Sequence, residues 1–317
     1  MTDPLRQVTL RQLQIFIAAA TGGGYARAGE QLHMTQPAIS MQMTKLSACV
    51  GLPLFEKRGR SVHLTRAGEQ LLPYARRIEQ TLREASEAIE AFRGLRHGAV
   101  RVGLVTTARH FAPRLVSQFR VQHPEIEVEV SIANREGTIA LLEESRIDVA
   151  VMGRPPPRLP VVAHPFARHP HGIIASPDHP LARRRRLPPE RLAEERFIVR
   201  EPGSGTRDAM EMFLAEHHVA KPRISQEMTS NESIKQAVIA GMGLAFISLH
   251  TVELERRAGQ LVLLDVKGLP VARTWYVLHA ASHILPPAGK AFLEFMRTDA
   301  PALMESIFPG SGKVPRR

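Results

Sequence analysis

Hydrophobic positions recur at helical spacing from the start of the chain. In "TLRQLQIFIAAA" the residues Leu10, Leu13, Ile17 and Ala20 fall on one face of a helix, with a phenylalanine beside them. The turn "TGGG" interrupts this pattern, and a second short helix is predicted from Tyr25 to Leu32. The pattern therefore indicates two short helices in quick succession.

A third helix is predicted directly after "HMT". Thr35 is a suitable N-cap, and Pro37 lies in the first turn, where its missing N–H costs nothing. Hydrophobic residues at spacings of four, three and four would form the buried stripe: Ile39, Met43, Leu46 and Val50. The opposite face carries Gln36, Ser40, Met41, Thr44 and Lys45.

Two short helices joined by a tight turn, the second with a polar outer face, are typical of a helix-turn-helix that enters the major groove of duplex DNA. The first residues of that outer helix would meet base edges. Gln36 could pair with adenine through two hydrogen bonds, Ser40 could contact either base type, and Met41 could touch a thymine methyl group. The sequence therefore favours a reader of double-stranded DNA.

A basic hairpin is predicted next. Two short strands, Phe55–Lys57 and Ser61–Leu64, stand on either side of the tip Arg58-Gly59-Arg60. A tip of this kind beside a recognition helix usually contacts phosphate or places an arginine in the minor groove. We expect Arg58 and Arg60 to bind DNA in this way, and a solvated surface turn is the alternative.

From Thr65, another suitable N-cap, the sequence stays helical to about Phe92. Its hydrophobic residues alternate spacings of four and three: Leu71, Ala75, Ile78, Leu82, Ala85, Ile89 and Phe92. This 3.5-residue repeat predicts a left-handed coiled coil between two copies of the chain, with dimer contacts at Leu71, Ile78, Leu82 and Ile89. An amphipathic helix packed on its own domain is the alternative. Pro73 should bend the early part of the helix.

Strands and helices alternate in the remainder of the chain. "GAVRVGLV", "IEVEVSI" and "IDVAVMG" read as strands, with helices from about Phe111 to Gln122 and at "TIALLEES". The same order returns with the strands "RFIVR", "RISQEM" and "GLAFIS" and the helices Thr206–His218 and Glu232–Ala240. Each half therefore predicts an α/β lobe with a parallel sheet and right-handed crossovers.

Further segments connect or follow these two lobes. Strands near Val161–Phe166 and Val262–Lys267 are predicted to cross between them, and "WYVLHA" with a helix from Pro287 to Met296 would complete the first lobe. The run Arg183 to Arg186 is predicted to be a solvated surface segment rather than a second nucleic-acid contact. The tail "FPGSGKVPRR" is predicted to be disordered.

Length and charge agree with a multi-domain protein that meets an anion. The chain has 317 residues, too many for one compact core, and a formal net charge of +11. Residues 1–66 hold eight Lys and Arg against three Asp and Glu, whereas residues 67–96 hold five of each. The one cysteine, Cys49, cannot form an internal disulfide. With no export signal and no apolar stretch long enough to span a membrane, we expect a cytoplasmic protein.

The stretch "REPGSGTR" stands between a strand and the start of a helix. In open α/β lobes, ligands gather at the carboxyl ends of strands, where helix N-termini present free N–H groups. Ser204, Thr206 and Arg207 would face an anion there, and Arg207 could supply a charge-assisted fork. Further effector contacts are expected from Thr106, Thr107, Asn134, Arg135, Arg154 and Asn231. A plain helix cap without a ligand is the alternative.

Motifs of catalysis and metal binding are weak in this sequence. "GSG" matches neither the P-loop nor the nucleophile elbow, and no third glycine completes a dinucleotide fingerprint. The histidines of "HPHG" and "EHH" lack metal-ligand partners at a working spacing. We therefore predict no catalytic residues, no metal site and no cofactor other than a small-molecule effector.

The run "QLxxFxxAxxxGxxxxAxxxLxxxQPAxSxQ", continued by "LFEKRGR" and "LTRAGE", resembles the DNA-binding end of LysR-type transcriptional regulators between Gln12 and Ile78. The resemblance implies a winged helix-turn-helix and a long linker helix, joined to an effector domain of two Rossmann-like lobes similar to periplasmic solute-binding proteins. It implies DNA contacts at Thr35, Gln36, Pro37, Ser40 and Met41, with Arg58 or Arg60 in the wing.

Three positions depart from the pattern of that family. Gly24 stands where the family usually caps the second helix with serine, a loss of a few tenths of a kcal/mol. Gly29 replaces the usual alanine inside that helix, at a cost of about 1 kcal/mol. Ser47 replaces the usual glutamate after Leu46. These changes bear on the rigidity of the second helix more than on the identity of the reader.

"ANREGT", "VMGRPP", "HPHGIIASPDHPL", "REPGSGTR" and "SNESIKQAVIAGMG" resemble the LysR-type regulators of Calvin-cycle carbon-fixation operons. This resemblance implies an activator of carbon dioxide fixation genes that binds promoter DNA and RNA polymerase. It implies self-association to a dimer or tetramer, and a phosphorylated metabolite or NADPH as effector. A LysR-type regulator of another pathway with a carboxylate effector is the main alternative. A solute-binding or catalytic α/β protein is the third, which the basic helix-turn-helix opposes.

These expectations divide the chain into three domains and a tail. Residues 1–65 would form the winged helix-turn-helix, residues 66–95 the dimerisation helix, and residues 97–300 the effector domain, with a tail at 301–317. The first lobe would hold about 97–162 and 267–300, and the second lobe about 163–266.

Overall fold

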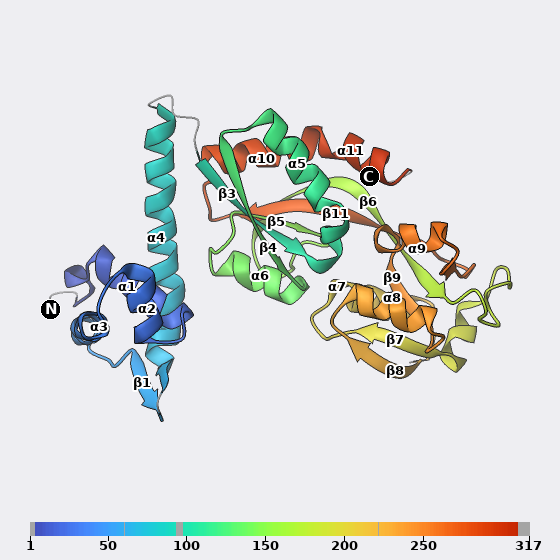
Figure 1. Ribbon diagram of the computed structural model, residues 1–317, viewed down its shortest axis with the longest axis horizontal. Coiled ribbons are helices and arrows are strands. Elements are labelled where there is room, and N and C mark those ends of the chain that lie inside the picture. Colours follow the sequence, from blue (N-terminus) through green and yellow to red (C-terminus); the bar gives the residue numbers. More distant parts are fainter. Residues whose placement is uncertain (1–3, 60, 93–97, 221, 310–317) are drawn as a thin grey trace. The chain divides into compact units, whose positions relative to one another are not determined.

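The structure is a computed structural model in which residues 4–59, 61–92, 98–220 and 222–309 are described (Figure 1). The chain divides into two compact units: Met1–Gly94 with Glu143–Arg146, and Leu95–Leu142 with Ile147–Arg317. The finer domain boundaries expected from the sequence stay a prediction.

The first unit contains the short helices, the hairpin and the long helix that the sequence predicts. Their bounds are η1 Pro4–Gln7, α1 Leu10–Thr21, α2 Tyr25–Leu32, α3 Gln36–Val50, β1 Phe55–Arg58, β2 Ser61–Leu64 and α4 Arg66–Phe92. Thr35 is the N-cap of α3, and the Thr65 hydroxyl oxygen accepts a hydrogen bond from the backbone N–H of Gly68 at the start of α4. Both residues therefore hold the predicted N-cap positions, and of the two only Thr65 makes a capping hydrogen bond with its side chain.

The buried face of α1 differs from the predicted one. Leu10 is 49% exposed and Ile17 is only partly buried, whereas Ile15 and Phe16 are fully buried. The reason is that α1 packs against α2, α3 and α4 together, which buries a broader face than one hydrophobic stripe. Of the predicted stripe, only Leu13 lies in the core.

Two glycines of α2 meet requirements of the backbone. Gly24 is the N-cap at φ +124°, a conformation that L side chains rarely adopt. A Cβ on Gly29 would lie 2.6 Å from the carbonyl oxygen of Met34. The sequence-based view that Gly29 only costs helix stability is therefore corrected, because the missing side chain lets the segment before α3 approach α2 closely.

The second unit holds two α/β lobes. The first is built from β3 Gly98–Val105, η2 Thr106–His110, α5 Ala112–Gln122, β4 Ile126–Ala133, α6 Arg135–Glu143, β5 Val149–Met152, α10 Pro287–Thr298 and α11 Ala300–Ile307. β3 pairs in parallel with β4 on one side and β5 on the other, as predicted. α11 was not predicted; it lies in the segment assigned to the tail, where Met304 is buried in the core of this lobe.

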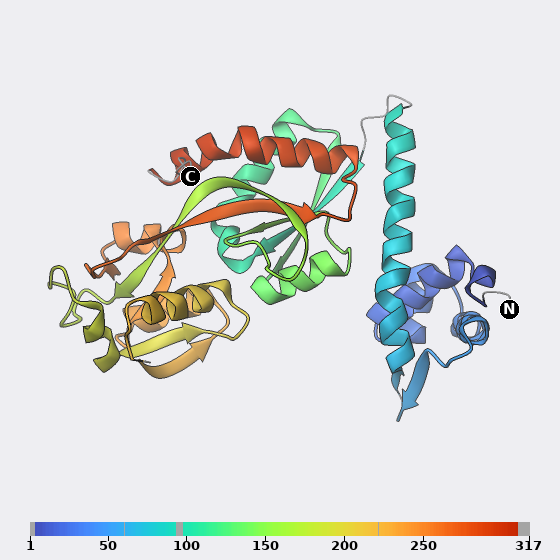
Figure 2. The same ribbon diagram turned by 180° about the vertical axis from the view of Figure 1, so that it is seen from behind.

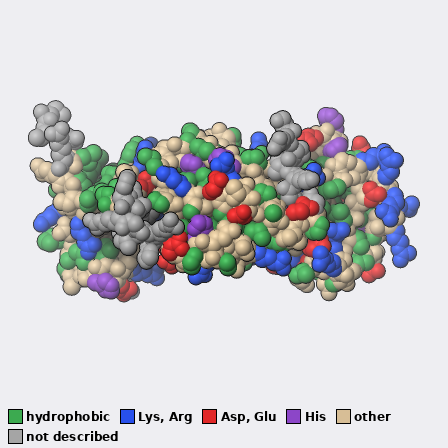
Figure 3. Space-filling view, turned by 90° about the horizontal axis from the view of Figure 1, so that it is seen from above, with side chains coloured by type: hydrophobic (Ala, Val, Ile, Leu, Met, Phe, Trp, Pro, Cys, Tyr) green, Lys and Arg blue, Asp and Glu red, His purple; other side chains and the backbone are tan. Residues whose placement is uncertain are grey.

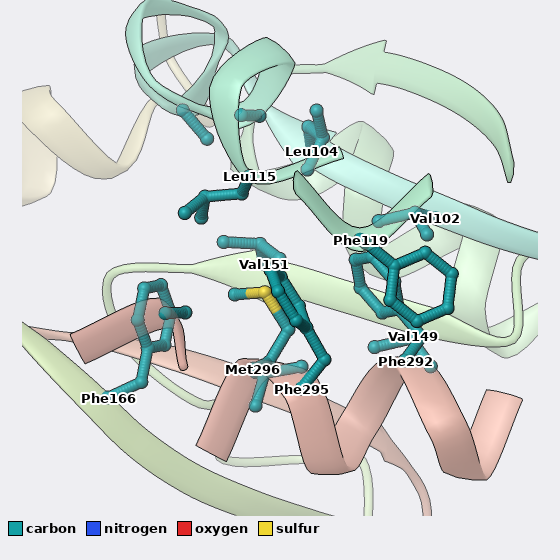
Figure 4. Close-up of a cluster of buried hydrophobic side chains, with 14 of the residues drawn as sticks. Val102, Leu104, Leu115, Phe119, Val149, Val151, Phe166, Phe292, Phe295 and Met296 are labelled. Atoms are coloured by element: carbon teal, nitrogen blue, oxygen red, sulfur yellow. The ribbon is translucent and has the colours of Figure 1, made fainter. Parts of the chain in front are cut away.

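Helices cover both faces of the sheet in the first lobe. Figures 1 and 2 show α5 and α10 on one face and α6 on the other. In the core between the sheet and α10, the ring of Phe119 stands edge-on to Phe292 and Phe295 at centroid distances of 5.1 and 5.4 Å, close to Val102 and Val149 (Figure 4). This packing holds the carboxyl ends of β3, β4 and β5 at one edge.

The second lobe repeats the order of the first. Its elements are η3 Pro189–Glu194, β7 Arg196–Arg200, α7 Gly205–Glu216, β8 Arg223–Met228, α8 Asn231–Ile239, β9 Ala245–Ser248, η4 Leu249–Thr251, α9 Glu253–Arg257 and β10 Val262–Leu263. β7 and β8 are parallel, and α7 and α8 pack in separate cores on either side of them. The side chains of Arg183 to Arg186 are exposed, as predicted. Figure 3 shows a group of Lys and Arg side chains at its right-hand end.

Two long antiparallel strands connect the lobes. β6 (Val161–Ala175) pairs with β11 (Val271–Ala280) from Val161 to His171, and its last residues, from His171 on, pair with β9 and β10. The crossing strand predicted near Val262–Lys267 was therefore wrong. Its alternating Leu264 and Val266 are buried in the core of the second lobe instead, where Val266 forms a β-bridge with Leu187.

Candidate functional site

The outer face of α3 matches the predicted DNA-reading surface. Ile39, Met43 and Leu46 are fully buried on the inner face. On the outer face the following residues are exposed: Thr35, Gln36, Pro37, Met41, Thr44 and Lys45. Ser40 is half-buried between them, and its carbonyl oxygen accepts a hydrogen bond from the Thr44 hydroxyl at 3.0 Å. The first two turns therefore offer an amide, a hydroxyl and a methionine methyl group, the groups that read base edges.

The wing hairpin carries one described arginine at its tip. The Arg58 guanidinium lies 2.6 Å from a carboxylate oxygen of Glu56, and both side chains are exposed. An exposed pair of this kind stabilises the fold little, so Arg58 can exchange Glu56 for a phosphate. Arg60, the other predicted wing contact, lies outside the described residues.

The hydrophobic repeat of α4 divides into two parts. Leu71 packs against the core of its own unit and Ala75 is fully buried there. Ile78, Leu82 and Ile89 are 44%, 45% and 57% exposed. The first part of the repeat therefore follows the alternative reading, a helix packed on its own domain. The second part is a stripe of exposed hydrophobic side chains, here called the α4 stripe.

A pocket lies between the two lobes of the second unit, at the carboxyl ends of their strands. We call it the interlobe pocket. Its lining comprises Val105, Thr106, Thr107, Arg135, Gly153, Arg154, His169, His171, Ser204, Gly205, Thr206, Asp208 and Arg273. The predicted effector residues Thr106, Thr107, Arg135, Arg154, Ser204 and Thr206 are thus brought together, from segments far apart in the sequence.

Arginines dominate the charge of the interlobe pocket. Arg135, Arg154 and Arg273 face one acidic residue, Asp208, whose carboxylate is 3.8 Å from Nε of Arg135. Burial lowers the pKa of Arg135 and of Arg273, because each charge is partly removed from water. The buried Nη1 of Arg135 has no hydrogen-bond partner among the described residues. A buried donor of this kind is costly until an acceptor reaches it.

The start of α7 forms the opposite wall of the interlobe pocket. Ser204 is the N-cap, and its hydroxyl oxygen accepts a hydrogen bond from the backbone N–H of Thr206 at 3.3 Å. Gly205 lies beside Arg135, since a Cβ there would be 3.2 Å from Cδ of that arginine. The first turn of a helix carries free N–H groups and a partial positive charge, so it complements the arginines in attracting an anion.

Two histidines line the floor of the interlobe pocket and are uncharged. Burial lowers the pKa of His171 to about 3 and holds that of His169 well below its usual value. His169 stacks on Trp275 with ring centroids 3.7 Å apart, and its Nε2 lies 3.1 Å from the Ser248 hydroxyl. The buried Nδ1 of His169 has no hydrogen-bond partner among the described residues. The floor therefore offers neutral polar atoms rather than further charge.

Three predicted effector residues lie outside the lining of the interlobe pocket. Arg207 donates hydrogen bonds to Glu211, to Glu227 and to the carbonyl oxygen of Arg200, and these carboxylates raise its pKa. Asn134 donates to Glu201 at 3.3 Å, and Asn231 accepts from Arg200 at 2.7 Å. The structure thus gives Arg207 an ion-paired position on the second lobe in place of the expected fork on an anion.

These three residues meet in one interlobe network around Arg200. Arg200 is 2% exposed and binds Glu201 through two hydrogen bonds of 2.7 and 2.8 Å. It also donates to the hydroxyl of Thr106, in the facing lobe, at 3.2 Å. Since Asn134 of that lobe donates to Glu201, the Arg200–Glu201 pair links the two lobes beside the pocket. The signal in the sequence is an arginine and a glutamate directly ahead of "PGSG".

Other pocket residues were missed at the level of sequence, chiefly Arg273, His169 and His171. Arg273 was overlooked because the second crossing strand was placed near Val262–Lys267, and the strand that carries Arg273 was assigned to the first lobe alone. The histidines were considered only as metal ligands. In the part of the chain that the structure describes, no cluster of three His, Cys, Asp or Glu is placed to hold a metal ion. Among the described helices, none has the length and hydropathy to span a membrane.

Family models match both units of the chain. Residues 10–69 match the model described as bacterial regulatory helix-turn-helix protein, lysR family, and residues 93–301 match the LysR substrate binding domain. The chain belongs to the LysR family. This family consists of DNA-binding transcriptional regulators, and the chain is therefore a regulator rather than an enzyme.

Relatives cover almost the whole chain. It is 43% identical over 291 residues to the HTH-type transcriptional regulator CfxR of Cupriavidus necator, and the match covers 92% of both chains. It is 44% identical over 293 residues to the RuBisCO operon transcriptional regulator of Allochromatium vinosum, covering 92% of this chain and 97% of that relative. The regulatory domain of Synechocystis PCC6803 CcmR in complex with 2-PG matches with a TM-score of 0.61 at 35% identity, covering 64% of this chain and 99% of that one.

Proposed function

We propose that this LysR-family regulator activates carbon-fixation genes in the cytoplasm and responds to a small phosphorylated acid in the interlobe pocket. The observation that carries the proposal is the meeting of Arg135 from one lobe with the N-terminus of α7 from the other, around a buried guanidinium nitrogen with no partner among the described residues. A sequence relative at 44% identity is named a RuBisCO operon transcriptional regulator, and a CcmR regulatory domain was solved with 2-PG.

The lining favours a compact oxyanion over NADPH. Arg135, Arg154 and Arg273 can bind carboxylate or phosphate oxygens in pairs, and the first turn of α7 can bind one more group. No Phe, Tyr or Trp side chain is among the described residues of the lining, so the rings left for a nicotinamide or adenine to stack on are the buried imidazoles of His169 and His171.

A carboxylate effector of another pathway is the second candidate, because arginine forks bind both chemistries. The two differ in charge and in the number of acceptor oxygens. Titration calorimetry of the full chain with 2-phosphoglycolate and with glycolate separates them. We expect binding of the phosphorylated acid at least about tenfold tighter, since the phosphate adds charge-assisted hydrogen bonds. Equal affinity would favour the carboxylate regulator.

Arg135 provides the direct test of the pocket. Arg135→Gln removes the charge while leaving a polar side chain, and the affinity for 2-phosphoglycolate should fall by about tenfold or more. Arg120→Gln, an exposed position on α5, is the matched control and should bind as the unaltered chain does. An Arg135→Gln chain that binds normally would remove this pocket from the proposal.

DNA binding in this proposal uses α3 and the wing, with two readers held by the α4 stripe. Self-association through Ile78, Leu82 and Ile89 places two recognition helices on two half-sites of a promoter. A tetramer and a contact with RNA polymerase extend the same proposal to transcription activation. The ligand changes regulation only as far as it binds one arrangement of the lobes better than the other.

A further inference from the structure

One face of α7 meets arginines of the interlobe pocket at two places. Gly205, Asp208 and Met212 follow each other at spacings of three and four, so they share a face of the helix. Gly205 and Asp208 stand beside Arg135. Met212 lies further along the same face, away from the N-terminus of α7. The helix therefore has a second contact region beyond its first turn.

Two arginines of the lining end on the side chain of Met212. Nη1 of Arg154 donates a hydrogen bond to Sδ of Met212 at 3.4 Å, and Nη2 of Arg273 donates to the same sulfur at 3.1 Å. A thioether is a weak acceptor and carries no charge. Among the described residues, neither Arg154 nor Arg273 forms an ion pair with a carboxylate. The two guanidinium groups therefore converge on one uncharged atom.

The guanidinium groups of the pocket also act on one another. Burial is the main cause that lowers the pKa of Arg273, and the positive charge of Arg154 adds to it. Burial likewise lowers the pKa of Arg135, and Arg154 acts there in the same direction. The carboxylates of Asp208 and Glu216 oppose the lowering at Arg273. Since Asp208 is the one acidic residue of the described lining, the positive charge around the pocket is only partly compensated.

We propose that the interlobe pocket has two anion subsites, and that Arg154 and Arg273 form the second one, which binds the carboxylate of the effector. This inference rests on the proposed function and assigns the phosphate to Arg135 and the N-terminus of α7. Two nitrogens that both reach one sulfur atom are close enough for a single carboxylate to bridge them. A carboxylate is also a much stronger acceptor for a guanidinium than a thioether is.

This arrangement makes Arg154 and Arg273 the residues that determine specificity. An effector that carries a phosphate and a carboxylate can bind both subsites at once. A phosphorylated alcohol or sugar binds the first subsite and leaves two partly desolvated arginines without an anion, which costs affinity. The second subsite therefore selects phosphorylated acids.

The test compares 2-phosphoglycolate with its neutral amide, 2-phosphoglycolamide. The amide keeps the phosphate and replaces the charged carboxylate by a carboxamide of similar shape. Titration calorimetry of the full chain measures both affinities, and their ratio reports on the second subsite. The unaltered chain should bind the acid at least about tenfold more tightly than the amide, since the charge-assisted hydrogen bonds are lost with the carboxylate.

Arg154→Gln and Arg273→Gln should each weaken binding of the acid by about tenfold while the affinity for the amide changes little, so that the ratio falls toward one. Arg135→Gln should weaken both ligands alike and keep the ratio. Arg223→Gln, an exposed arginine on β8, is the matched control and should leave both affinities unchanged. Circular dichroism checks first that each variant is folded.

Met212→Glu gives a second, independent check. Its carboxylate would stand where the sulfur meets the two guanidinium groups, and would fill the second subsite from within the chain. The acid should then lose most of its advantage over the amide. Met242→Glu, at another exposed methionine of the second lobe, is the control and should keep the ratio.

Two results would overturn the second subsite alone. In one, the unaltered chain binds the acid and the amide equally; in the other, Arg154→Gln and Arg273→Gln weaken both ligands by the same factor. The phosphorylated ligand still binds in both cases, so the proposed function stands. A chain that binds neither ligand would overturn the proposed function and this inference together.

Discussion

Two single side chains are predicted to make two separate kinds of DNA contact. Gln36 is exposed at the start of α3, where its amide can read a base edge, while Arg58 stands on the wing, where its charge can meet a phosphate. The sequence predicted the exposed position of Gln36 from the buried stripe of α3, and that of Arg58 from the two short strands around the hairpin tip. Their functional roles stay predictions.

Gln36→Ala should relax the choice between promoter sequences while the salt dependence of binding stays the same. Arg58→Ala should weaken binding to all duplexes alike and reduce the slope of log affinity against log salt by about one. Fluorescence anisotropy with promoter and random duplexes at several salt concentrations measures both quantities. If the two variants behave alike, the division into base reading and phosphate contact is wrong.

His171 makes stability depend on pH. Its pKa is about 3 in the folded chain, against about 6.5 for an unfolded histidine, so the unfolded state binds the proton first as pH falls. The contribution of the neutral His171 ring to the free energy of unfolding is fully present above pH 6.5. It is lost as the pH falls toward 3, by up to about 1.4 kcal/mol per pH unit.

His171→Gln should therefore flatten the fall of unfolding free energy between pH 6.5 and pH 4.5, as measured by urea unfolding. His218→Gln, at an exposed position, is the control and should leave the slope unchanged. An unaltered slope in the His171 variant would show that this ring is not kept neutral by the fold.

At the scale of elements, the sequence predicted most helices and strands within a few residues. The regular spacing of hydrophobic residues predicted the helices α3 and α4 and the strands β3, β4 and β7. It failed for the second crossing strand, because Leu264 and Val266 alternate as a strand would while their burial comes from packing in the second lobe. Arg273 was lost from the predicted site for the same reason. Arg207 was misplaced because neighbours distant in sequence, such as Glu227, cannot be read from a local motif.

The α4 stripe is the element-scale prediction. Ile78→Glu with Leu82→Glu should convert dimers to monomers. Two copies would otherwise have to bury carboxylates of like charge against each other in the coiled-coil seam. Thr81→Glu, exposed on the same helix, is the control. Sedimentation velocity gives the mass directly, and an unchanged sedimentation coefficient in the double variant would reject the stripe as the dimer contact.

The whole molecule joins a DNA-reading unit to a ligand-binding unit. The sequence predicted that both units are present, but it did not predict the contacts between the two lobes of the ligand-binding unit. The Arg200–Glu201 pair and the Arg135–Asp208 contact link the two lobes on the pocket side, so a bound anion changes the balance of contacts that hold the lobes together. No pattern in the sequence pairs Arg200 with Thr106, since the pairing depends on how the two lobes close.

The most direct measurement is DNA affinity of the full chain with and without 2-phosphoglycolate. A fragment from the promoter of a carbon-fixation operon and a random duplex of equal length are titrated at one salt concentration. We expect the chain to prefer the promoter fragment clearly. We also expect 2-phosphoglycolate to change the DNA affinity or the DNA bending, and Arg135→Gln to abolish this effect of the ligand. Equal binding to both duplexes, unaffected by the ligand, would contradict it.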